Sequence, residues 1–111
     1  MHLVVAVLRP AQLERVRQAL AAIHVTRLTI CDAQGYAAVG ERIVQESVVE
    51  IAVNDDFLER TVDTIRRAIE PADAATTPAA DARRHAAERV FVLPIQEAVQ
   101  IYRDVRGPEA V

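Results

Sequence analysis

The side chains best suited to chemistry in this sequence are its arginines. All 13 basic residues are arginine, because no lysine occurs anywhere in the 111-residue chain. A guanidinium group can bind phosphate oxygens in a bidentate manner, so the arginines are candidates for phosphate contacts. The absence of lysine excludes a Walker-type phosphate loop and any enzyme that uses a lysine as Schiff base or general base.

The remaining reactive residues form no recognisable catalytic or metal site. The three histidines are scattered, and no two have the spacing of metal ligands. The single cysteine, Cys31, excludes an intramolecular disulfide and a cysteine-based zinc cage, and we expect it to lie in the core. Glu46 and Glu50 are expected on one face of a strand, but no base, nucleophile or metal accompanies them. We predict a protein that is not an enzyme, has no metal site and requires no cofactor.

Length and composition favour one cytoplasmic domain spanning residues 1–111. The hydrophobic fraction is 51%, the aromatic fraction 4% and the formal net charge −3, which suits a single domain with its own core. The net acidity and the few aromatic residues argue against a nucleic-acid partner. The first apolar run, 3–8, is too short for a signal sequence, and no stretch reaches the length of a membrane span. No direct membrane insertion is expected.

The hydrophobic pattern predicts alternating strands and helices. Short β-branched apolar runs predict strands over 3–8, 26–32, 44–53 and 89–93. Apolar residues at helical spacing predict helices over 10–22 and 55–69. Gly35 is expected to mark a break after the second strand, and Asn54 to act as the N-cap of the second helix. Residues 71–87 lack periodicity and predict a long mobile loop, and 99–102 predict a short fifth element.

This order of elements predicts an α+β fold. Two βαβ units interlock into a four-stranded antiparallel sheet with both helices on one face, which is the ferredoxin-like βαββαβ arrangement. The strands are apolar on both faces, so the face without helices also needs cover. We therefore expect the chain to oligomerise through the open face of the sheet.

Several blocks of the sequence resemble the P-II signalling proteins. The similar blocks are VVAVLRP at 4–10, LT at 28–29, GY at 35–36, VEIAVNDD at 49–56, FV at 91–92 and RGPEAV at 106–111. No single block is specific to that family, but their combination and order are. The resemblance implies a homotrimer of ferredoxin-like subunits that binds adenine nucleotides in the clefts between neighbours. It also implies regulation of a partner protein.

The sequence departs from the P-II pattern in both loops. The family's long partner-binding loop is reduced to a short segment, 36–43, and Glu46 stands where the family has a lysine linked to 2-oxoglutarate. The family's short glycine-rich phosphate loop is replaced by a long flexible segment, 71–88, which contains no glycine. The basic residue before the fourth strand is kept as Arg89. The chain is therefore identified as a divergent, P-II-like member of the superfamily.

The resemblance and the residue chemistry together predict a nucleotide site. Thr29 suits a purine edge, Gly35 allows close approach of a ligand, and Arg89 is the best phosphate candidate. Two family arginines are replaced by Gln100 and Tyr102, which lowers the positive field of the site. The predicted nucleotide-binding set is Val7, Thr29, Gly35, Tyr36, Ala37, Ala52, Arg89, Gln100, Tyr102 and Arg103. Further candidate phosphate contacts are Arg83, Arg84 and Arg106.

The predicted function is a homotrimeric P-II-like regulator that senses ADP, AMP or ATP between its subunits. Its partner is expected to be another protein, either a membrane transporter or an enzyme of carbon or nitrogen metabolism. One alternative is a trimeric scaffold that has lost nucleotide binding, which the missing glycines and arginines favour. Another is a relative of the P-II-like receptors for cyclic di-AMP, because those also combine a short first loop with a long second one.

Overall fold

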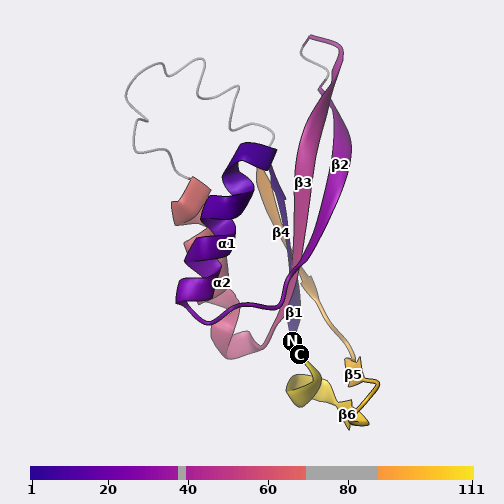
Figure 1. Ribbon diagram of the computed structural model, residues 1–111. Helices are drawn as coiled ribbons and strands as arrows, with labels where there is room; N and C mark the ends of the chain where they lie inside the picture. The colour runs from indigo at the N-terminus through magenta and orange to yellow at the C-terminus, as the bar shows by residue number, and fades with distance from the viewer. Residues whose placement is uncertain (38–39, 70–87) are drawn as a thin grey trace.

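The computed structural model describes residues 1–37, 40–69 and 88–111. A four-stranded antiparallel sheet in the order β2-β3-β1-β4 carries both long helices on one face (Figure 1). The strands are β1 (His2–Leu8), β2 (Thr29–Ala37), β3 (Arg42–Val53) and β4 (Arg89–Pro94), and the helices are α1 (Leu13–Ala22) and α2 (Asp55–Ile69). The structure confirms the predicted α+β arrangement. The predicted loop 71–87 lies outside the described residues.

The core lies between the sheet and the helices. Alternate residues of β1, namely Val4, Ala6 and Leu8, are buried almost completely on the helix side. Leu20 of α1 and Ile65 of α2 are fully buried against the same face. This period of two in the strands and of three to four in the helices is what makes the elements readable from sequence.

Among the described residues, no helix covers the opposite face of the sheet (Figure 1). Val5 pairs with Phe91 and Leu3 pairs with Leu93 on neighbouring strands, so these side chains share that open face. Phe91 is 49% exposed and Leu93 is 45% exposed. Cys31, which was expected in the core, is exposed because it lies on β2 at an edge of the sheet. That expectation is wrong.

The second strand differs from its predicted bounds. β2 begins at Thr29 and runs to Ala37, and each of its residues pairs with β3 from Glu50 back to Arg42. Gly35 is therefore inside the strand, opposite Val44, and does not mark a break. The ends of the predicted short loop, 36–43, belong to the two strands, since β2 runs to Ala37 and β3 begins at Arg42. Residues 38–39 lie outside the described residues. The pairing of β1 with β3 ends where Leu8 lies opposite Ser47. Residues 33–37 of β2 and 42–46 of β3 continue past this point as a projecting two-stranded arm (Figure 1).

The second helix has its predicted bounds, 55–69, but the start of the first helix and the cap of the second differ from expectation. The first helix is preceded by a 3-10 turn, η1 (Pro10–Gln12), and the α-helix proper begins at Leu13. The side chain of Asn54 does not cap α2, because its Oδ1 accepts no hydrogen bond from the described residues; its amide nitrogen donates to the carbonyl oxygen of Pro108 at 3.1 Å. The carboxylates of Asp55 and Asp56 occupy the first turn of α2, as expected from the helix dipole.

The C-terminal segment adds a small separate unit. β5 (Val99–Gln100) pairs with β6 (Val105–Arg106), and the 3-10 turn η2 (Gly107–Ala110) follows. The short fifth element predicted at 99–102 is thus a strand of two residues and part of a turn. Gly107 has φ of 75° and donates its N–H to Ala98, which turns the chain back toward the sheet.

Candidate functional site

Several predicted site residues gather at the end of the sheet where β1 ends and β4 begins. Val7 pairs directly with Arg89, and Gly35 and Tyr36 lie on the arm that projects from the same end. Arg89 is exposed, and Tyr36 is 70% exposed. We call Val7, Gly35, Tyr36 and Arg89 the upper cluster. The backbone of Ala37 continues the same strand, opposite Arg42.

The space beside Gly35 is filled by Glu46. A Cβ atom built on Gly35 would lie 2.5 Å from Oε1 of Glu46, so only a glycine accommodates this carboxylate without a shift. The two residues belong to neighbouring strands of the arm, where Gly35 pairs with Val44. The close approach expected of a ligand at Gly35 is thus made by a negatively charged side chain, which would repel a phosphate placed there.

A buried carboxylate fixes the chain directly before Arg89. The side chain of Glu88 is 5% exposed, and its Oε1 accepts hydrogen bonds from Nε of Arg9 at 2.9 Å and from Nε2 of Gln12 at 2.7 Å. Oε1 of Gln12 in turn accepts the backbone N–H of Arg9. This network joins the turn after β1 to the start of β4. It therefore fixes the position of the backbone at Arg89.

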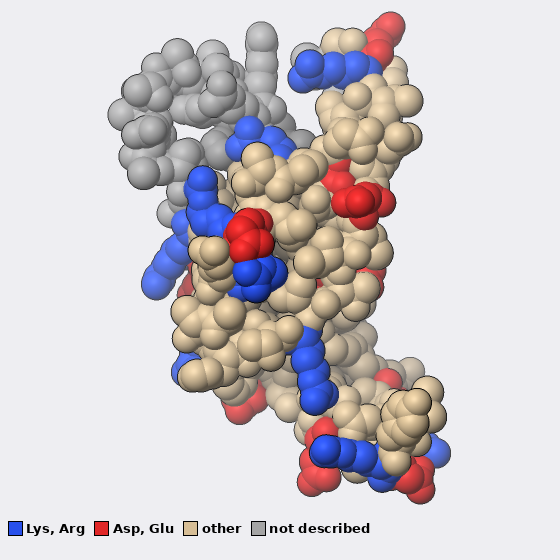
Figure 2. Space-filling model, viewed as in Figure 1, with Lys and Arg blue, Asp and Glu red and all other residues tan. Residues whose placement is uncertain are grey.

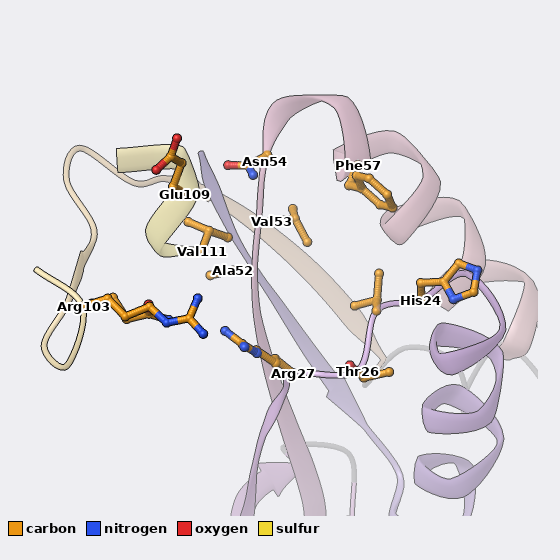
Figure 3. A pocket seen from close by; sticks show the side chains of 12 residues that line it. His24, Thr26, Arg27, Ala52, Val53, Asn54, Phe57, Arg103, Glu109 and Val111 are labelled. Atoms are coloured by element: carbon orange, nitrogen blue, oxygen red, sulfur yellow. The ribbon is translucent and has the colours of Figure 1, made fainter. Parts of the chain in front are cut away.

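A second group of predicted residues lies at the opposite end of the sheet, around a pocket of about 390 Å³. This C-terminal pocket is lined by His24, Val25, Thr26, Arg27, Ala52, Val53, Asn54, Phe57, Gln100, Arg103, Glu109 and Val111. A second hollow of about 500 Å³ adjoins it, shares Thr26, Arg27, Ala52 and Val111, and adds Thr29. Four predicted nucleotide contacts, Thr29, Ala52, Gln100 and Arg103, are therefore found at this end. Ala52 and Arg103 are labelled in Figure 3.

The segment that follows α1 forms one wall of the C-terminal pocket. His24 has φ of 66°, and the N–H groups of His24 and Val25 donate to Ala21 and Leu20. This pair of bonds is a Schellman motif, in which a left-handed residue ends the helix and reverses the chain. Val25 is buried behind it, so Thr26 and Arg27 are led across the lower end of the sheet.

The facing wall is the C-terminal segment. The side-chain amide of Asn54, just after β3, donates a hydrogen bond to the carbonyl oxygen of Pro108 at 3.1 Å. The backbone N–H of Gly107 donates to the carbonyl oxygen of Ala98 at 2.8 Å. These bonds bring Glu109, Val111 and Arg103 over Ala52, as Figure 3 shows. The pocket therefore exists only because the last residues fold back onto β3.

Several predicted contacts stand outside both groups. Tyr102 is fully exposed and lines neither hollow. Arg106 donates from Nη1 to Glu97 at 2.7 Å and so already has a carboxylate partner. Arg83 and Arg84 lie outside the described residues. Arg27 was missed by sequence reasoning, although a charged residue two positions before Thr29 was a signal that could have found it.

The described residues hold no group of three or more His, Cys, Asp or Glu side chains that could bind a metal ion. In the same part of the chain, no helix is both long and apolar enough to span a membrane. Acidic and arginine side chains are interspersed over the face seen in Figure 2. The amino group of Met1 donates to Oδ1 of Asp55 at 2.7 Å, and this bond and its charge lower the pKa of that carboxyl.

Comparison with known proteins decides the family. The family model described as nitrogen regulatory protein P-II matches residues 1–105. The chain belongs to the P-II family. P-II proteins are regulators, so this assignment agrees with the absence of any catalytic constellation in the sequence.

Individual P-II proteins align over nearly the whole chain. Nitrogen regulatory protein GlnK1 of Methanosarcina mazei is 30% identical, covering 100% of this chain and 97% of its own length. A nitrogen regulatory protein P-II of Bradyrhizobium diazoefficiens is 28% identical over 96% of both chains. The crystal structure of Arabidopsis thaliana PII bound to citrate superimposes with a TM-score of 0.78 at 24% identity, covering 99% of this chain and 91% of that one. The last likeness shows the fold.

Proposed function

We propose that this P-II protein is a cytoplasmic homotrimer that binds an adenine nucleotide in the clefts between its protomers and thereby regulates a partner protein. The observation that carries the proposal is the separation of the predicted contacts into the upper cluster and the C-terminal pocket. Within one chain these two groups lie at opposite ends of the same sheet.

The length of the strands supports a site that is shared between chains. Gly35 and Thr29 are six residues apart along β2, which corresponds to about 20 Å at 3.3 Å per residue. Val7 and Leu3 are likewise separated along β1. A site that uses both groups needs the upper cluster of one protomer to meet the C-terminal pocket of its neighbour.

The open face of the sheet supplies the surface for such an assembly. Phe91 and Leu93 are half exposed on it, and apolar patches of this kind are typical of interfaces between subunits. A cyclic trimer places the same two patches of each protomer in contact around a threefold axis. Each of its three clefts then receives one upper cluster and one C-terminal pocket.

Regulation of a partner follows from the family, and the arm of β2 and β3 is the element suited to it. Tyr36 and Ile43 pair near its tip and are 70% and 66% exposed. Exposed aromatic and aliphatic side chains on a projecting hairpin are typical contacts for another protein. A nucleotide at the base of the arm would change the affinity for that protein only if it bound more tightly to one conformation of the arm than to another.

Mixing defective chains tests the shared site directly. An Arg89→Ala chain lacks the upper contact, and a Thr29→Ala/Gln100→Ala chain lacks the lower ones, so each homotrimer should bind ADP weakly in calorimetric titration. In an equal mixture refolded together, about a quarter of the clefts combine two intact halves and should recover normal affinity. A mixture with no recovered sites, or single homotrimers with undiminished affinity, would contradict the proposal.

A trimeric scaffold without a nucleotide is the second candidate, and Glu46 is the observation that favours it. Its carboxylate occupies the position beside Gly35 at which a phosphate was expected. Gln100 adds no charge in the C-terminal pocket. Titration with ADP, ATP, AMP and cyclic di-AMP separates the two candidates, because a scaffold binds none of them.

A further inference from the structure

Two arginines converge on the C-terminal pocket from different parts of the chain. Arg27 reaches it from the segment before β2, and Arg103 reaches it from the turn between β5 and β6. Figure 3 shows the two guanidinium groups pointing toward one another across the space over Ala52. Arg27 also lines the adjoining hollow, so it stands where the two spaces join.

Neither guanidinium group has a carboxylate partner among residues 1–37, 40–69 and 88–111. Four of the other nine described arginines are in ion pairs: Arg9 with Glu88, Arg17 with Glu14, Arg66 with Asp63 and Arg106 with Glu97. Glu109 lines the same pocket, but its carboxylate points away from both arginines in Figure 3. Two like charges that face one another without a counterion repel, and an anion between them relieves that repulsion.

The rest of the lining fits a small oxyanion. Ala52 has only a methyl group and leaves room in front of the arginines, and the hydroxyl of Thr26 offers a neutral donor next to them. Guanidinium groups bind the planar or tetrahedral oxygens of carboxylates and phosphates with paired hydrogen bonds. The pocket volume of about 390 Å³ accommodates such a group together with the small molecule that carries it.

We propose that Arg27 and Arg103 form an oxyanion site that holds a phosphate or carboxylate group of a small effector. The inference rests on the proposed function, because it uses the same pocket, and it adds the charge of the ligand and the residues that hold it. An anion bound by both arginines would contact both walls of the pocket, so its binding would also link the C-terminal segment to the segment before β2.

Inorganic phosphate and succinate are the probes, because they carry the two oxyanions without a nucleoside. Each is titrated into the full-length protein by calorimetry at constant ionic strength, with sodium chloride as the blank. Saturable binding of either probe is expected, and the probe that binds identifies whether the effector's anion is a phosphate or a carboxylate. Arg27→Gln and Arg103→Gln should each weaken that binding about tenfold, since each removes a charge-assisted pair of hydrogen bonds.

The matched control is Arg67→Gln, which removes the same charge from the exposed surface of α2, away from the pocket. It should bind the probe as tightly as the unaltered protein. The inference is overturned if neither probe saturates, or if all three variants bind alike. A separate ADP titration distinguishes the two proposals: ADP binding unaffected by Arg27→Gln and Arg103→Gln overturns the oxyanion site alone. Phosphate binding without nucleotide binding overturns the nucleotide site alone.

Discussion

At the scale of single residues, Glu46 and Gly35 depend on one another. The carboxylate lies where a side chain at position 35 would begin, and it is the flexible end of its own side chain. A ligand phosphate near the base of the arm would therefore meet a negative charge unless this side chain turns away. Glu46 thus contributes a negative charge beside Gly35 of the upper cluster, to which Arg89 contributes a positive one.

Replacing Glu46 by glutamine should strengthen the binding of ADP. Removing one negative charge near the phosphates is expected to gain about 1 kcal/mol, or about fivefold in affinity, at the effective dielectric of a protein surface. Calorimetric titration measures the change. Glu41→Gln is the control, because it removes a charge from the turn of the same arm without a contact to Gly35. Equal affinities for the Glu46 variant and the unaltered protein would show that no phosphate approaches this carboxylate.

Asp55 gives a prediction for acid pH. The hydrogen bond from the Met1 amino group and its charge lower the pKa of Asp55 in the folded protein, and Nδ1 of His2 lies 2.9 Å from the same oxygen. A carboxyl with a lowered folded pKa adds stability above its unfolded pKa, near 3.9, and loses it as the pH falls through the folded value. Asp55→Asn should therefore lower the melting temperature at pH 6, and the difference should shrink below about pH 4.

The control for Asp55 is its neighbour. The side chain of Asp56 makes no hydrogen bond or ion pair in the described part of the chain, so Asp56→Asn removes a charge from the same turn without the Met1 interaction and should lower the melting temperature at pH 6 less than Asp55→Asn does. A difference between the Asp55 variant and the unaltered protein that stays constant down to pH 2 would argue against this interaction. The melting temperature is measured by circular dichroism at each pH.

At the scale of elements, the network around Glu88 ties β4 to the turn after β1. The carboxylate is almost completely buried and accepts hydrogen bonds from Arg9 and Gln12. Glu97 and Arg106 form a similar pair on the C-terminal unit, but both side chains are at least 60% exposed. The two ion pairs therefore have the same chemistry but differ in how deeply their carboxylates are buried.

Breaking the two pairs should have different costs. Glu88→Ala is expected to lower the free energy of unfolding by about 2 to 3 kcal/mol, because the donors of Arg9 and Gln12 lose a partially buried charged acceptor. Glu97→Ala should cost less than about 1 kcal/mol, as exposed pairs generally do. Urea denaturation measures both values. Equal losses in the two variants would contradict a structural role for the Glu88 network.

Much of this architecture was predictable, because burial follows the apolar period along β1, β3 and α2. The start of β2 was not predictable, since the left-handed turn at His24 and the burial of Val25 delay the strand to Thr29. Gly35 predicted a break because glycine weakens strands. Continuous pairing with β3 keeps this residue inside β2 instead. The C-terminal pocket depends on the hydrogen bond between Asn54 and Pro108. Because these residues are 54 positions apart, no local sequence pattern predicts this bond.

At the scale of the whole molecule, the open sheet face and the divided site point to the same assembly. The half-exposed apolar side chains on β4 would be covered by neighbouring protomers. The same packing would bring an upper cluster to a C-terminal pocket. The account therefore links oligomerisation to ligand binding, so that a loss of the first should abolish the second.

A charge on the open face tests that link. Phe91→Glu places a carboxylate in the proposed interface and should convert trimers to monomers in light scattering, because an unpaired buried charge is strongly unfavourable. Tyr36→Glu is the control, since that side chain lies on the projecting arm and is 70% exposed. A Phe91→Glu protein that keeps the mass of three chains would show that this face is not the interface.

The most direct test of the central claim is a calorimetric titration of ADP into the unaltered protein, with its mass measured by light scattering in the same buffer. The account predicts a particle with the mass of three chains that binds one nucleotide per chain, and a Phe91→Glu monomer that binds none. A trimer that gives no heat with ADP, ATP or AMP, or a monomer that binds nucleotide as tightly as the trimer, would contradict it.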